Sequence, residues 1–144
     1  MKPNVGKSIL GGLVGTAVMT MMMYKGAPMM IGKKMDIAER IGSMIGDNWL
    51  IGMAMHWMNG VIVFPLIFVF LISNLLPGKS IVKGILWALL LWLIAQAILM
   101  PMTGAGFFSS NNGGMKVVIA SMMGHIIYGA ILGAFSGCEK CTKD

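Results

Sequence analysis

Charged residues are scarce in this sequence. They make up 11% of its 144 residues, whereas a soluble domain usually carries about 25%. The acidic residues all lie outside the long apolar runs: Asp36, Glu39, Asp47, Glu139 and Asp144. The runs therefore contain no carboxylate pair for acid–base catalysis and no carboxylate chain for proton transfer. We expect no independent enzymatic activity.

Cysteine and histidine are also rare. The chain has two of each, and both cysteines, Cys138 and Cys141, lie in a C-x-x-C pattern near the C-terminus. A structural zinc site needs four ligands, so these thiols would complete one only between two protomers. The alternative is a tail without a metal. No glycine-rich phosphate-binding motif stands between a strand and a helix, which excludes the common nucleotide-binding folds.

Apolar residues, by contrast, form 57% of the chain. A run of about 20 of them can cross the hydrocarbon core of a bilayer as a helix. Four such runs occur, at about residues 8–24, 49–76, 81–100 and 115–135. The sequence therefore predicts an all-α integral membrane protein, a four-helix bundle forming a single transmembrane domain over residues 1–144 with a short tail at 136–144. Pro65 interrupts the second run, and a membrane helix tolerates this where a neighbouring helix satisfies the freed carbonyl.

A segment of mixed charge lies between the first two runs, at about residues 29–46. Apolar residues recur there at helical spacing, at Ile31, Met35, Ala38, Ile41 and Ile45, and charged residues fill the positions between them. This pattern is typical of an amphipathic helix in the membrane interface. The alternative is a polar loop.

The two halves of the chain resemble each other. Each histidine is the centre of a nine-residue stretch, GMAMHWMNG around His56 and SMMGHIIYG around His125, with a glycine four residues after it. A proline–methionine corner, at Pro28 or Pro101, precedes each stretch. The pattern indicates two tandem helix hairpins related by an axis along the membrane normal. Such an axis would bring the histidines to similar depth.

The histidine stretches have two interpretations. In one, His56 and His125 are the axial ligands of haem b, and Gly60 and Gly129, on the same helix faces, leave room for its ring. In the other, the small residues let helices pack closely, and each histidine bonds a neighbouring carbonyl or hydroxyl. An ionisable residue inside a membrane favours a functional site.

Methionine suggests a third interpretation. The chain has 17 methionines, and thioether and imidazole ligands together suit copper(I). Met100 and Met102 are then further ligands beside His56 and His125. Three functions remain open: a haem-holding electron-transfer or accessory subunit, a transporter or channel for a metal ion or protons, and a structural membrane partner without a cofactor.

The net charge of +6 lies on loops and ends, which indicates contact with anionic lipid headgroups rather than nucleic acid. Counting lysine and arginine on each side places both termini in the cytoplasm. We expect an integral membrane protein whose partners are the bilayer and a respiratory or other membrane complex, or further copies of itself.

Five segments follow one another along the chain: GGLVGTAVMT, APMMIGKKMDIAERIGSMIG, HWMNG, MPMTGAGF and GHIIYGAILG. In this layout the chain resembles a family of small bacterial four-span membrane proteins of unknown function, loosely akin to the YagU-like inner-membrane proteins. The resemblance implies a four-helix inner-membrane protein whose histidine motifs fall at His56 and His125. It also implies that the protein lies in the bacterial inner (cytoplasmic) membrane, and it implies no activity, substrate or cofactor.

Overall fold

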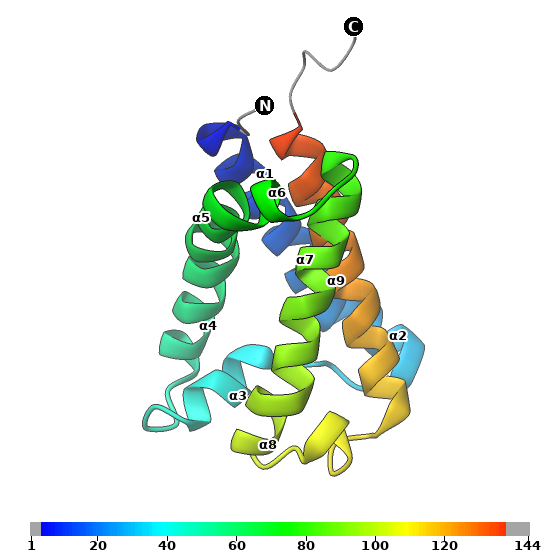
Figure 1. Ribbon diagram of the computed structural model, residues 1–144. Helices are drawn as coiled ribbons and strands as arrows, with labels where there is room; N and C mark the ends of the chain where they lie inside the picture. Colours follow the sequence, from blue (N-terminus) through cyan, green and yellow to red (C-terminus); the bar gives the residue numbers. More distant parts are fainter. Residues whose placement is uncertain (1–3, 138–144) are drawn as a thin grey trace, which may run out of the picture.

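Four long helices dominate the fold. The computed structural model describes residues 4–137, and no strand occurs in that range. The helices are long and apolar enough to cross a membrane: Val5–Ile31, Trp49–Leu75, Ser80–Met102 and Met115–Ser136. They stand side by side as a bundle (Figure 1). The prediction of an all-α protein with four membrane-spanning helices is confirmed.

Three of the four spans are interrupted by π-helical turns. The first consists of α1 (Val5–Met21), η1 (Met22–Gly26) and α2 (Ala27–Ile31). The second consists of α4 (Trp49–Met58), η2 (Asn59–Val63), α5 (Phe64–Ile67), η3 (Phe68–Ile72) and α6 (Ser73–Leu75). The third consists of α7 (Ser80–Ile94), η4 (Ala95–Leu99) and α8 (Met100–Met102), while the fourth, α9 (Met115–Ser136), is continuous.

Prolines explain three of these π-helical turns. Pro28, Pro65 and Pro101 each follow a π turn by two residues, and a proline has no N–H to bond a carbonyl in the preceding turn. In the second span, the Phe64 N–H bonds the Asn59 carbonyl, so the next carbonyl, that of Gly60, would need an N–H at position 65. It accepts instead from the Tyr128 hydroxyl of α9, at 2.7 Å. A neighbouring helix thus satisfies the carbonyl that Pro65 frees.

In the first span, the carbonyl that Pro28 frees is bonded by the loop that follows the span. Ala27 N–H bonds the Met22 carbonyl, and the following carbonyl, that of Met23, accepts from the backbone N–H of Met35 at 3.0 Å. The chain after α2 is therefore held against the helix it has just left. This return positions the segment that follows, residues 36–43, at the end of the bundle.

We expect Tyr128→Phe to lower the free energy of unfolding by about 1–3 kcal/mol, because the substitution leaves the buried Gly60 carbonyl without a donor. Thermal unfolding in mild detergent checks this. Ser43→Ala, which removes an exposed hydroxyl bonded to a carbonyl of its own helix, serves as a comparison. Equal melting temperatures for wild type and Tyr128→Phe would contradict the role given to this hydrogen bond.

α9 lies at the centre of the packing, against α7 on one side and α1 on the other. Its glycines allow close approach: a Cβ atom at Gly84 of α7 would lie 2.8 Å from the backbone nitrogen of Gly133. Near the chain ends, the buried Ser8 hydroxyl donates to Ser136 at 2.7 Å. The beginning of α1 and the end of α9 are therefore at the same end of the bundle.

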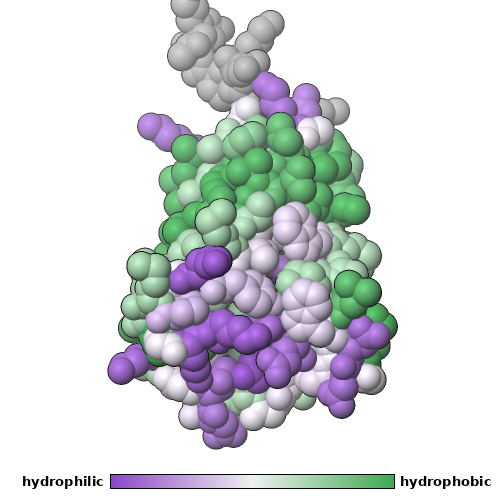
Figure 2. All heavy atoms as spheres, turned by 180° about the vertical axis from the view of Figure 1, so that it is seen from behind, coloured by the Kyte–Doolittle hydropathy of each residue, from purple (hydrophilic) through white to green (hydrophobic). Residues whose placement is uncertain are grey.

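A short helix, α3 (Ile37–Ser43), crosses the opposite end of the bundle (Figure 1). It is shorter than the predicted range of about 29–46, because α2 continues the first span to Ile31 and Gly32 ends it in the left-handed conformation, at φ +77°. α3 is amphipathic, with Ala38 and Ile41 buried and Glu39 exposed. Figure 2 shows hydrophilic side chains gathered over this half of one face and apolar ones over the other half.

Candidate functional site

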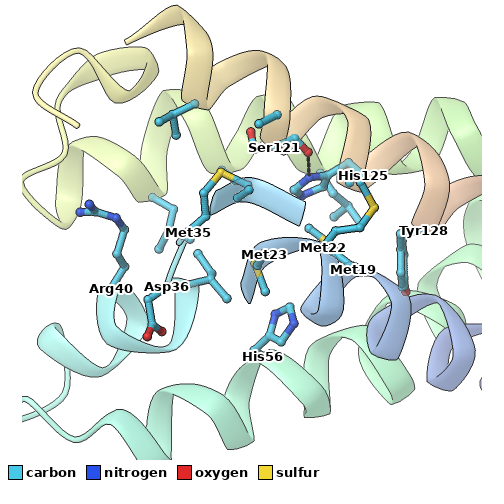
Figure 3. Close-up of a pocket in the computed structure, with 18 of the residues that line it drawn as sticks. Met19, Met22, Met23, Met35, Asp36, Arg40, His56, Ser121, His125 and Tyr128 are labelled. Atoms are coloured by element: carbon cyan, nitrogen blue, oxygen red, sulfur yellow. Dashed lines mark hydrogen bonds between the residues drawn. The ribbon is translucent and has the colours of Figure 1, made fainter. Parts of the chain in front are cut away.

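A cavity of about 180 Å³ lies among the spans at the end that α3 covers. Residues of all four long helices and of α3 line it. Both histidines are among them, His56 from α4 and His125 from α9, and Figure 3 shows their side chains on opposite sides of the pocket. The structure therefore brings the two predicted site histidines to one cavity.

One ring nitrogen of His56 is hydrogen-bonded to another side chain of the protein. Its Nε2 lies 3.1 Å from the Thr20 hydroxyl oxygen. That hydroxyl donates its proton to the Thr16 carbonyl at 2.7 Å, so it can only accept from the imidazole. In the neutral ring, Nε2 therefore carries the proton and Nδ1 keeps a free lone pair.

His125 is fixed in the other tautomer. Its Nδ1 lies 2.8 Å from the Ser121 carbonyl oxygen, one turn earlier on α9. A carbonyl only accepts, so Nδ1 donates and Nε2 keeps the lone pair. An imidazole held in this way by a backbone carbonyl is oriented as metal-ligating histidines usually are. Both rings thus retain one nitrogen able to bind a ligand.

Methionine side chains form much of the cavity wall. Those lining it are Met19, Met22, Met23, Met30, Met35 and Met100. Of the two predicted methionine ligands, Met100 is buried at the cavity and Met102 is 63% exposed on the outside. Within residues 4–137, no three His, Cys, Asp or Glu side chains come together to hold a metal ion. For a bare metal ion at the histidines, the thioethers of this wall are available as further ligands.

The predicted site glycines are helix contact points. Gly60 lines the cavity, and it also packs against the Thr16 side chain of α1. Gly129 lies elsewhere, against Gly84 and Ala88 of α7. The sequence pattern predicted that a close contact keeps both positions small. In this structure, the group in contact with each glycine belongs to another helix of the bundle.

A buried hydrogen-bond network supports the His125 side of the cavity. Gln96 of η4 donates to the Ser121 hydroxyl at 2.9 Å, and Ser109 donates to the Gln96 amide oxygen at 2.9 Å. The Trp92 indole also donates to Ser121, at 3.0 Å. These bonds fix the turn of α9 whose carbonyl orients His125. The sequence shows Gln96 as a polar residue within an apolar run, but not its partners.

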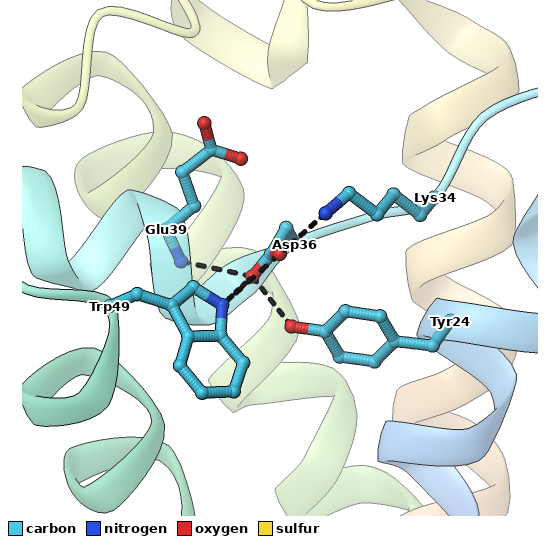
Figure 4. Close-up of polar contacts among 5 residues, drawn as sticks. All are labelled: Tyr24, Lys34, Asp36, Glu39 and Trp49. Atoms are coloured by element: carbon cyan, nitrogen blue, oxygen red, sulfur yellow. Dashed lines mark hydrogen bonds and ion pairs between the residues drawn. The ribbon is translucent and has the colours of Figure 1, made fainter.

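The α3 end of the cavity carries the charged groups. The Asp36 carboxylate accepts hydrogen bonds from Tyr24 at 2.6 Å and from the Trp49 indole at 3.1 Å, and it pairs with Lys34 at 3.2 Å (Figure 4). Burial tends to raise the pKa of Asp36, but these donors and the Glu39 N–H outweigh it, and the pKa is lowered. Asp36 is therefore ionised and fully engaged.

The predicted metal ligands Cys138 and Cys141 lie outside the described residues 4–137. The site that the structure does describe consists of the histidine pair, its methionine wall and the charged end beneath α3. This combination defines the molecule as an integral membrane four-helix protein with an internal, histidine-lined cavity.

The chain belongs to DUF6789, a family of unknown function, whose model matches residues 3–140. No curated protein and no solved structure was found to match it. Its function must therefore be argued from the cavity.

Proposed function

We propose that this protein holds haem b inside its bundle, with His56 and His125 as axial ligands, and acts as an electron-transfer or accessory subunit of a membrane complex. The chief support is that two imidazoles from different spans line one cavity, each with a ring nitrogen that has no hydrogen bond within residues 4–137. Haem iron takes neutral imidazole as an axial ligand. The hydrogen bonds from each ring to Thr20 and Ser121 would set the ligand tautomers.

The size of the cavity favours an organic group over a bare ion. Its volume is about 180 Å³, whereas one buried water needs roughly 10–15 Å³. The side chains of Met22 and Met23 lie between the two histidines in the view of Figure 3. Methionine has three rotatable bonds and repacks readily, so these side chains can move aside for a ring. A bound haem would supply one-electron chemistry.

Purified protein from haem-replete cells is expected to be coloured, with a Soret band and sharp bands after dithionite reduction. His56→Ala and His125→Ala should each abolish the reduced spectrum, because each removes one axial ligand. Met102→Leu, at an exposed position, is the matched control and should leave it unchanged. A colourless wild-type protein, or colour that survives both histidine substitutions, would contradict the haem proposal.

Passage or storage of a copper(I) ion is the second candidate, and the methionine wall favours it. The predicted copper set, the two histidines with Met100, lines the same cavity, whereas Met102 does not. Imidazole and thioether together are a soft ligand set. A colourless protein that retains copper, and loses it in Met100→Leu but not in Met102→Leu, would place copper ahead of haem.

A purely structural role has less support. Gly129 and Gly133 of α9 contact α7 of the same chain, at Gly84 and Ser80. For location, we propose the bacterial inner membrane with both termini in the cytoplasm. The support is the count of lysine and arginine in the sequence, which is six on the side of the termini and five on the other.

A further inference from the structure

We infer that the ligand of this cavity carries an acidic group, and that Arg40 binds it. The inference rests on the proposed function, in which the acidic group is a haem propionate. It adds a second recognition element, on α3, to the histidine pair of the spans. Arg40 lines the cavity at the end opposite Tyr128, as Figure 3 shows.

Arg40 is half-buried, and its guanidinium has no partner among the residues that the structure describes. No hydrogen bond or ion pair of its guanidinium occurs within residues 4–137, although its backbone groups are bonded to Asp36 and Ser43. A guanidinium stays charged at any physiological pH, and leaving it partly desolvated without an anion costs free energy. Its planar fork of donors matches a carboxylate with two parallel hydrogen bonds.

The nearby acids cannot serve as its partner. Asp36 accepts from Tyr24, Trp49 and Lys34. Glu39 lies on the exposed side of α3. Of the other cations of this end, Lys33 bonds Asn112 and Lys34 pairs with Asp36, while Lys25 and Lys116 are exposed and do not line the cavity. Among the residues that line the cavity, Arg40 is thus the cation available to an anionic ligand.

The cavity wall between Arg40 and the histidines specifies the rest of the ligand. It is largely apolar and rich in methionine: Met35 lies toward the charged end, and Met22 and Met23 of the first span lie beside the histidines. A molecule that satisfies both ends is an amphiphile, acidic at the interface and apolar within the membrane. Haem b has this form, with two propionates on one edge of an apolar ring, and a long-chain carboxylate shares the chemistry.

Blocking the acid tests the inference directly. Apoprotein in mild detergent is titrated with haem b and with haem b dimethyl ester, in which the propionates carry no charge. We expect wild type to bind the acid about 10- to 100-fold more tightly than the ester. Arg40→Gln should bind both forms with the affinity that wild type shows for the ester, and Arg40→Lys should fall between because it keeps the charge without the fork.

Lys116→Gln, which removes an exposed lysine at the same end, is the matched control and should keep the wild-type preference. A wild-type protein that binds acid and ester equally, or an Arg40→Gln variant that still prefers the acid, overturns the inference. If neither form of haem binds, the proposed function fails, and the same variants are titrated with a long-chain fatty acid and its methyl ester. A preference for the acid that depends on Arg40 then sustains the inference, and its absence overturns it.

Discussion

Gly84→Leu is expected to prevent the third and fourth spans from packing. A Cβ atom at Gly84 would press on the carbonyl oxygen of Gly129 and lie 2.9 Å from the Cα of Gly133. These atoms are backbone and cannot rotate away, so α7 and α9 must separate. Helices in a membrane associate largely through such close packing, because lipid offers no hydrophobic driving force between them.

The loss of stability should be large because the apolar core lies at the same contact between α7 and α9. Trp87 and Ala88 of α7 pack with Tyr128 and Leu132 of α9 in one buried cluster. Overpacking alone costs about 1–3 kcal/mol, and more where backbone must move, so we expect Gly84→Leu to lower the free energy of unfolding by more than about 3 kcal/mol. Unfolding in mixed detergent and dodecyl sulfate measures this loss.

Gly26→Leu provides the control, since a Cβ atom at Gly26 would meet only Met22, at 3.8 Å or more. It adds the same side chain to a glycine of another span and should unfold close to wild type. If Gly84→Leu unfolds as the control does, the close approach of α7 and α9 is not what holds this half of the bundle together.

The spans could be predicted because they depend on local composition. A run of apolar residues defines a membrane helix whatever surrounds it, and Pro65 was recognisable as a position that needs help from a neighbour. The identity of that neighbour, Tyr128, depends on which helix lies next to the second span. Composition carries no such information, and neither does it reveal that Gly84 is the partner of Gly129.

The cavity wall was harder to predict than the histidines. Met22 and Met23 appeared only as part of an apolar methionine run, and Arg40 as one charge among several on a predicted interfacial helix. Helix faces follow from a regular 3.6-residue repeat, and one extra residue in a π turn rotates the following residues by about 100°. Since η1, η2 and η4 occur beside the cavity, a fixed repeat misassigns the faces there.

Asp36→Ala is expected to release α3 from the bundle. The carboxylate is 9% exposed and caps α3 by accepting the Glu39 N–H at 3.0 Å. It also joins Tyr24 of the first span to Trp49 of the second. Removing it leaves the hydroxyl, the indole N–H and the cap without an acceptor, and we expect a loss of about 2–4 kcal/mol in the free energy of unfolding.

The charge of Asp36 gives this loss a pH dependence. Its pKa in the folded protein is lowered from 3.8, so its stabilising contribution is complete above that value and is lost as the pH falls through the folded pKa. Wild type should therefore lose more stability than Asp36→Asn when the pH is lowered from 7 to 3. Melting curves of both proteins across this range measure the difference.

Asp47→Asn is the matched control, because Asp47 is an exposed acid at φ +57°, a conformation that asparagine tolerates. It should change stability by less than about 0.5 kcal/mol. Equal melting of Asp36→Ala and this control would show that the carboxylate does not hold α3.

Release of α3 should also change the cavity, because α3 carries Arg40 and closes that end of the bundle. Asp36→Ala is then expected to weaken binding of an acidic ligand while His56 and His125 keep their hydrogen bonds to Thr20 and Ser121. A variant that loses the preference for acid over ester but still binds the ester would separate the two ends of the site: α3 selects the acidic group, and the spans hold the apolar body.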